Sequence, residues 1–241
     1  MPYIDVAGES TYYETWGSGT PLVLLHGGYC SLEVMRELAE LLAERFEVHA
    51  PERAGHGRTA DREGPYSYAR MAVDTVAYLD AAGIDRAHVV GFSDGGITAL
   101  LLARDHGDRV LSIVPISGNL STDAYVPEDY PHPTITEEAH AAVDREYAEL
   151  SPDGPEHSEV VLGKLGALWA IEPDIPAESL AGVTAPTLVL AGEHDAIRRD
   201  HTESVAAAIP GARAEFVDGT THMLVREKPA EVAARILAFL G

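Results

Sequence analysis

Cysteine, long apolar runs and positive charge are all scarce in this chain of 241 residues. Cys30 is its only cysteine, so an internal disulfide bond cannot form and a reducing compartment is expected. No apolar run approaches the ~20 residues that a membrane-spanning helix needs. The first residues have neither a basic flank nor a long apolar stretch, which predicts no signal peptide and a cytoplasmic location.

Basic residues are also scarce relative to acidic ones, with 17 Lys and Arg against 39 Asp and Glu and a formal net charge of −22. The resulting field repels polyanions, so we expect neither a nucleic acid nor an anionic membrane as a partner. The same field would favour cationic substrates, but an acidic surface that keeps the chain in solution explains the charge without one. Composition therefore leaves the substrate and the oligomeric state open.

Apolar runs alternate with helical patterns along most of the chain. The first two runs flank Ala7 and Gly8 and predict an antiparallel hairpin. The expected strands cover residues 3–6, 10–15, 22–25, 48–50, 88–92, 110–116, 187–191 and 214–217. Helical patterns fall near residues 38–42, 73–79, 97–104, 205–209 and 229–240. This alternation predicts the α/β class, with a mostly parallel twisted sheet covered by helices on both faces.

The alternation stops between residues 119 and 180. Thr134 and Glu137 have the spacing of a capping box, and two helical patterns follow it. We therefore expect a core of residues 1–118 and 181–241, with residues 119–180 inserted as a helical cap over the site. The expected cap offers large side chains that either line a pocket or only pack in the interior: Tyr125, Tyr130, Tyr147, Leu168 and Trp169.

A Gly-x-Ser-x-Gly-Gly turn lies between the expected strand 88–92 and the helical pattern at 97–104. This arrangement is typical of a nucleophile elbow, in which small neighbours leave a strained serine exposed. Gly91 and Gly95 fit because a Cβ at either position would collide across the tight turn. The pattern makes Ser93 the candidate nucleophile.

A serine hydroxyl needs a base within hydrogen-bond reach and a third group that orients the base. His222 follows the last expected strand, where that base belongs. Asp195 ends the run Gly-Glu-His-Asp after the strand 187–191, at the edge of the sheet where sites of open α/β folds gather. Glu193 and Asp200 are the alternative acids. The expected triad is Ser93, His222 and Asp195.

An acyl-transfer site also needs two preorganised donors for the oxyanion. The backbone N–H of Asp94 is one candidate, because Asp94 follows the nucleophile at a helix N-terminus. The second donor is expected in His26-Gly-Gly-Tyr29, from Gly28 or alternatively from Tyr29. His26 is expected to hold this loop by hydrogen bonds, and it is a candidate for contact with substrate together with Tyr29, Asp94 and Trp169.

The elbow, the His-Gly-Gly loop, Gly-Glu-His-Asp and Gly-x-x-His together resemble the α/β-hydrolase superfamily, over all of the chain except the cap. Residues 50–59 resemble its Asp-x-Arg-Gly-x-Gly-x-Ser stretch, with Glu52 where aspartate is usual. Gly-Phe-Ser-Asp-Gly-Gly-Ile-Thr-Ala-Leu and the later Gly-Asn-Leu-Ser are similar to the valacyclovir hydrolase group. That resemblance implies that Asp94 binds the amino group of amino-acid esters; the alternative is that Asp94 only interacts with the helix dipole and solvent.

The resemblance implies a cofactor-independent serine hydrolase that cleaves carboxylic esters of small molecules. Dehalogenases and epoxide hydrolases of this fold use an aspartate nucleophile, so Ser93 argues against both. Alternatives with the same triad are a carbon–carbon bond hydrolase, a lactonase, a perhydrolase or haloperoxidase, and a biosynthetic acyl transfer or rearrangement catalyst. A ligand-binding receptor or a degenerate hydrolase is the non-enzymatic alternative. No metal site is expected.

Overall fold

The computed structural model describes residues 2–241 and contains one eight-stranded sheet. The strands are β1 (Tyr3–Val6), β2 (Glu9–Gly17), β3 (Thr20–Leu25), β4 (Phe46–Pro51), β5 (Ala87–Phe92), β6 (Val110–Ile116), β7 (Leu188–His194) and β8 (Arg213–Thr221). Their order is β1-β2-β4-β3-β5-β6-β7-β8. The pairs β1–β2 and β2–β4 are antiparallel and the others are parallel, so the predicted mostly parallel sheet is confirmed.

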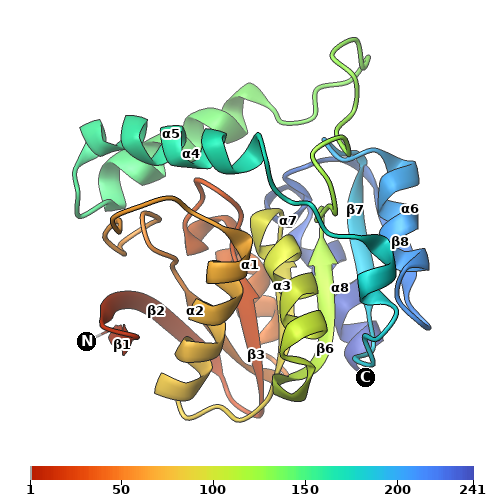
Figure 1. Cartoon of the computed structure of the whole chain (residues 1–241), viewed down its shortest axis with the longest axis horizontal. Coiled ribbons are helices and arrows are strands. Elements are labelled where there is room, and N and C mark those ends of the chain that lie inside the picture. The colour runs from red at the N-terminus through yellow and green to blue at the C-terminus, as the bar shows by residue number, and fades with distance from the viewer. Residues whose placement is uncertain (1) are drawn as a thin grey trace.

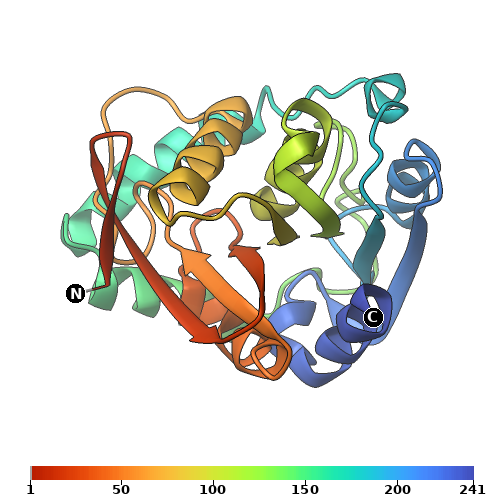
Figure 2. The same ribbon diagram turned by 90° about the horizontal axis from the view of Figure 1, so that it is seen from below.

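Helices cover both faces of this sheet (Figures 1 and 2). They are α1 (Arg36–Leu42), α2 (Tyr68–Ala81), α3 (Asp94–Asp105), α4 (Glu137–Leu150), α5 (Ser158–Trp169), α6 (Arg199–Ala207), α7 (Leu224–Glu227) and α8 (Pro229–Leu240). No helix among residues 2–241 combines the length and the apolar character needed to cross a bilayer.

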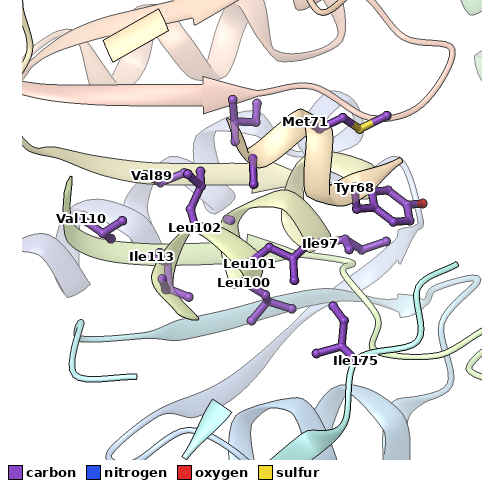
Figure 3. Packing of buried hydrophobic residues seen from close by; sticks show 14 of the residues in the cluster. Tyr68, Met71, Val89, Ile97, Leu100, Leu101, Leu102, Val110, Ile113 and Ile175 are labelled. Atoms are coloured by element: carbon purple, nitrogen blue, oxygen red, sulfur yellow. The ribbon is translucent and has the colours of Figure 1, made fainter. Parts of the chain in front are cut away.

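The core is divided by the sheet, because successive strand residues point to opposite faces. Val23 and Leu25 of β3 join α2, α3 and α6 in one buried cluster, part of which is shown in Figure 3. Leu22 and Leu24 join α1 and α8 in the other cluster. This alternation of fully buried side chains explains why the central strands read as continuous apolar runs.

The predicted hairpin at the start of the chain is present, and its turn depends on Ala7 and Gly8. Both residues have positive φ, 53° and 90°, which is the conformation that two-residue hairpin loops require. β2 is longer than expected because its residues from Tyr13 to Gly17 pair with β4. β7 and β8 also extend beyond their expected ends, since they pair with each other as far as His194 and Thr221.

The insertion between β6 and β7 carries α4 and α5, which lie across the carboxyl ends of the strands (Figure 1). The expected capping box at Thr134 is wrong: Thr136 is the N-cap of α4, and its hydroxyl accepts the N–H of Ala139 at 3.2 Å. The Thr134 carbonyl instead accepts the N–H of His222 at 2.9 Å. The start of the cap is therefore tied to the loop that follows β8.

Candidate active site

Ser93 lies in a sharp turn between β5 and α3. Its backbone has φ 53° and ψ −116°, a strained conformation that only a tightly packed turn maintains. A Cβ on Gly91 would lie 2.0 Å from the Gly95 carbonyl oxygen, and one on Gly95 would lie 2.1 Å from the Leu25 oxygen. Both positions therefore require glycine, and the turn holds the Ser93 hydroxyl above the carboxyl end of β5.

His222 lies between Ser93 and Asp195. Its Nε2 is 2.9 Å from the Ser93 Oγ, and its Nδ1 is 2.7 Å from the Asp195 Oδ1. The three residues come from the ends of β5, β7 and β8, which are far apart in sequence. The fold thus brings together all three residues of the expected triad, in the hydrogen-bonded order that a serine nucleophile needs.

Asp195 is enclosed by groups that favour its carboxylate form. Burial opposes the charge, but His222 and hydrogen bonds from the Ser117 hydroxyl (2.5 Å) and the Gly192 N–H (3.0 Å) hold the pKa of Asp195 below its ordinary value. Ser117 follows β6 directly and has φ 54°. The sequence analysis did not predict that Ser117 supports Asp195. A polar side chain at the carboxyl end of a parallel strand is the pattern that could have indicated it.

The alternative acids, Glu193 and Asp200, bond to other groups, whereas Asp195 holds the His222 Nδ1. Glu193 accepts the N–H of Gly219 at 2.7 Å, and Asp200 pairs with Arg198 at 3.0 Å. Both carboxylates are exposed at the surface.

A cavity of about 450 Å³ opens above Ser93 and His222. Its floor is formed by the elbow and by residues 27–29, and its roof by α4, α5 and their flanking segments. Core and cap both contribute apolar side chains to the cavity, namely Tyr29, Phe92, Tyr125, Ile135, Val143, Leu162, Trp169 and Met223. Of the large cap residues named as wall candidates, Tyr125 and Trp169 line the cavity, whereas Tyr147 and Leu168 pack in the core and Tyr130 lies elsewhere.

The loop after β3 brings two backbone donors to the same cavity. No acceptor among residues 2–241 takes the N–H of Gly28 or of Tyr29. Tyr29 has φ 57°, so the loop curls and both residues line the cavity. A Cβ on Gly28 would lie 2.4 Å from the Asp94 Oδ2, which explains the glycine.

His26 does not line the cavity, so the expected contact between His26 and substrate has no support in the geometry. Its Nε2 accepts the backbone N–H of Arg53 at 3.1 Å, and its Nδ1 lies 2.8 Å from the Gly27 oxygen. Burial and the neighbouring Arg53 lower the pKa of His26 well below its ordinary value. A neutral ring that holds the Arg53 loop against the Gly27 loop accounts for these contacts.

Asp94 has a buried side chain with partners from two other elements. Tyr68 of α2 donates its hydroxyl to Oδ1 at 2.9 Å, and the Trp169 indole N–H lies 3.2 Å from Oδ1 and 3.3 Å from Oδ2. Burial raises the pKa of Asp94, although Arg53, Tyr68 and Trp169 each favour the charged form. The expectation that Asp94 interacts only with the helix dipole and solvent is therefore wrong, because the carboxyl group is enclosed.

Comparison with known proteins finds a family model and full-length relatives that match this chain. Residues 22–235 match the model of the alpha/beta hydrolase family. The chain is 30% identical over its whole length to "Putative carbamate hydrolase RutD" of Azorhizobium caulinodans, covering 98% of that protein. It is also 26% identical to a non-heme haloperoxidase of Rhodococcus erythropolis, covering 100% of this chain and 99% of the other.

Solved structures give the same result for the fold. The enol-lactonase of Burkholderia xenovorans LB400 superposes with a TM-score of 0.81 at 22% identity, covering 99% of both chains. A structure described as "Est816 as an N-Acyl homoserine lactone degrading enzyme" superposes with a TM-score of 0.82 at 26% identity, covering 99% of this chain and 100% of the other. The chain therefore belongs to the alpha/beta hydrolase family, and it is a hydrolase.

Proposed function

We propose that this chain is a carboxylic-ester hydrolase that acts through Ser93, His222 and Asp195 and an acyl-enzyme intermediate. The observation that carries the proposal is the unbroken hydrogen-bonded path from the Ser93 Oγ through His222 to Asp195, at 2.9 and 2.7 Å. Ser93 belongs to a strained elbow that faces a largely apolar cavity. Such a cavity fits the acyl or alcohol part of a small ester.

In the proposed reaction, the Ser93 Oγ attacks the carbonyl carbon while the His222 Nε2 takes its proton. The carbonyl oxygen becomes an oxyanion, which accepts hydrogen bonds from the N–H of Asp94 and from that of Gly28 or Tyr29. The oxyanion collapses, the carbon–oxygen bond to the alcohol breaks, and His222 returns the proton to the departing alcohol oxygen. Water then attacks the acyl-enzyme by the same steps and releases the carboxylic acid and free Ser93.

Asp195 would act on His222 alone in this mechanism. Its carboxylate accepts the Nδ1 proton of His222 in a hydrogen bond, which leaves Nε2 free to accept the proton of Ser93.

Cys30 lines the same cavity, but burial raises the pKa of its thiol to about 12, so the thiol stays neutral and does not compete as a nucleophile. The cytoplasmic location expected from the cysteine content stays a prediction.

Replacement of Ser93 by alanine tests the proposal. We expect Ser93→Ala to lower kcat for a p-nitrophenyl ester by at least about 10⁴-fold, as the loss of a triad nucleophile does in other hydrolases, and to abolish labelling by a fluorophosphonate. Ser204→Ala is the matched control, because the Ser204 side chain is exposed and donates to the His201 carbonyl within α6. Turnover by Ser93→Ala at the wild-type rate would contradict the assignment.

Carbamate cleavage is a second candidate, favoured by the full-length similarity to the RutD protein. A carbamate presents the same carbonyl to Ser93 and the same developing oxyanion to the backbone donors. A matched panel of p-nitrophenyl acetate, a p-nitrophenyl carbamate and a γ-lactone separates the classes. If the carbamate has the highest kcat/KM, the substrate class changes and the triad proposal is kept.

A further inference from the structure

The Asp94 carboxylate joins three parts of the molecule at the floor of the cavity. Asp94 itself belongs to the elbow, Tyr68 begins α2 in the core, and Trp169 ends α5 in the cap. The Tyr68 hydroxyl lies 2.9 Å from Oδ1, and the Trp169 N–H is shared between Oδ1 and Oδ2 at 3.2 and 3.3 Å. The residue that follows the nucleophile is thus bonded directly to the cap.

These contacts leave little of the carboxylate available to a ligand. Asp94 is only 3% exposed. The Gly28 backbone closes one side so tightly that a Cβ there would lie 2.4 Å from Oδ2 and 2.7 Å from the Trp169 ring. An ammonium group at Oδ2 would compete with the indole N–H for that oxygen. Displacement of the indole N–H would leave a part-buried donor without an acceptor.

The positive charge of Arg53 near Asp94 also disfavours a cationic ligand. The buried Arg53 guanidinium lowers the pKa of Asp94 by Coulombic attraction, so it already compensates the carboxylate. A substrate ammonium would meet the repulsion of this cation as well as the loss of its own hydration. Two further polar residues line the cavity from α4, His140 and Asp144, and both are exposed.

We propose that Asp94 is a positioning residue that anchors the cap through Trp169, and that the site takes esters with uncharged, apolar acyl groups. This inference rests on the proposed ester hydrolase function and specifies its substrate class. Trp169 donates the hydrogen bond to Asp94 and also forms part of the cavity wall. The bond therefore sets the distance between the cavity roof and the elbow.

A pair of esters tests the substrate class, namely the p-nitrophenyl esters of L-valine and of 3-methylbutanoic acid, its analogue without the amino group. We expect the wild type to prefer the uncharged ester. Asp94→Asn should lower kcat/KM for both esters by the same factor, within about threefold. Loss of tenfold or more for the valyl ester alone would overturn the proposal and make Asp94 an amine-binding residue.

Trp169→Phe tests the anchor, because phenylalanine keeps an aromatic wall and removes the N–H donor. We expect it to raise KM for both esters more than it lowers kcat, since the roof loses its fixed position. The double variant Asp94→Asn/Trp169→Phe should be no worse than the more impaired single variant, because both changes act on the same hydrogen bond: asparagine removes its charge and phenylalanine removes its donor. Additive losses, with the Asp94→Asn effect confined to the valyl ester, would contradict the anchor.

Fluorescence supplies a readout that does not depend on turnover. Trp16 and Trp169 are the only tryptophans, and Trp16 lies beneath Arg36 on β2, so Trp16→Phe leaves Trp169 as a single reporter. In this background we expect Asp94→Asn to shift the Trp169 emission, whereas L-valinamide should leave it unchanged. A saturable change with L-valinamide, absent with 3-methylbutanamide and abolished by Asp94→Asn, would overturn the proposal.

Failure to hydrolyse either ester would count against the proposed function, and this fluorescence test would still decide the role of Asp94.

Discussion

Glu52 is an acidic residue whose whole side chain is enclosed. Its carboxyl group accepts the N–H of Leu32 at 3.2 Å and that of Arg58 at 2.5 Å, and it pairs with the Arg58 guanidinium at 3.0 Å. Burial dominates over these partners and raises the pKa of Glu52 to about 7. The chain carries Glu52 where related sequences usually have aspartate, and the longer side chain fills the turn against Gly57.

Glu52 should make the stability of the fold depend on pH. Because its folded-state pKa lies above its ordinary 4.5, the stability that its protonated form contributes is fully present below pH 4.5 and is lost as the pH rises through 7. At about 1.4 kcal/mol per pKa unit, this loss is on the order of 3 kcal/mol. The Glu52→Gln variant cannot titrate there, so its unfolding free energy should decline less than that of the wild type between pH 5 and 8.

Urea unfolding at several pH values measures this difference. Glu37→Gln, on the exposed part of α1, is the matched control and should follow the wild type throughout. A constant gap between wild type and Glu52→Gln across the whole range would show that Glu52 keeps one protonation state.

At the scale of elements, the turn between β5 and α3 and the helix α5 respond differently to the same substitution. Gly95→Ala should lower the free energy of unfolding by more than about 3 kcal/mol or abolish folding, since the new Cβ would lie 2.1 Å from the Leu25 oxygen. Gly163→Ala is the matched control within α5, where a Cβ meets nothing within 4 Å. It should stabilise the protein by up to about 1 kcal/mol, because alanine is the better helix former.

Soluble yield and urea unfolding followed by circular dichroism compare these two variants. Wild-type stability in Gly95→Ala would mean that the elbow tolerates a side chain. A strongly destabilised Gly163→Ala would mean that α5 packs more closely than its open surface indicates.

The cap is also joined to the core through Asp61. Asp61, in the loop before α2, pairs with Lys164 of α5 at 2.6 Å and with His157 at 2.9 Å, and it accepts the Tyr66 hydroxyl at 2.5 Å. These hydrogen bonds outweigh the effect of burial and hold the pKa of Asp61 at about 2. Polar contacts of this kind, together with the ion pair between Arg226 of α7 and Glu146 of α4, fix the position of the roof on the core.

At the scale of the whole molecule, the formal charge of −22 should destabilise the folded state through self-repulsion. Raising the ionic strength from 0.01 M to 0.15 M shortens the Debye length from about 30 Å to about 8 Å and screens most of this repulsion. We expect the melting temperature to rise by a few degrees over that range. NaCl and KCl should act alike if screening is the cause; a flat response in both would show that local ion pairs already balance the charge.

The elbow was the part of the site easiest to predict, because the residues that form the turn are close together in the sequence. Gly91, Ser93 and Gly95 read as a turn from local sterics alone, and the turn is present. The ends of β7 and β8 were placed too early, because the two strands extend each other by pairing, which a single segment does not reveal. The N-cap of α4 was misplaced by two residues, since both Thr134 and Thr136 offer a hydroxyl and only the tertiary position of Thr134, bonded to His222, excludes it.

The sequence by itself determined the α/β class, the elbow and the order of Ser93, Asp195 and His222, because periodicity and turn sterics depend on near neighbours. Only the tertiary structure decided that Ser117 supports Asp195, that His26 bonds to Arg53 and that Asp94 bonds to Trp169. Asp94 and Trp169 are separated by 75 residues. Their contact exists because the cap packs on the carboxyl end of the sheet, and no local pattern encodes the orientation in which two surfaces so distant in sequence meet.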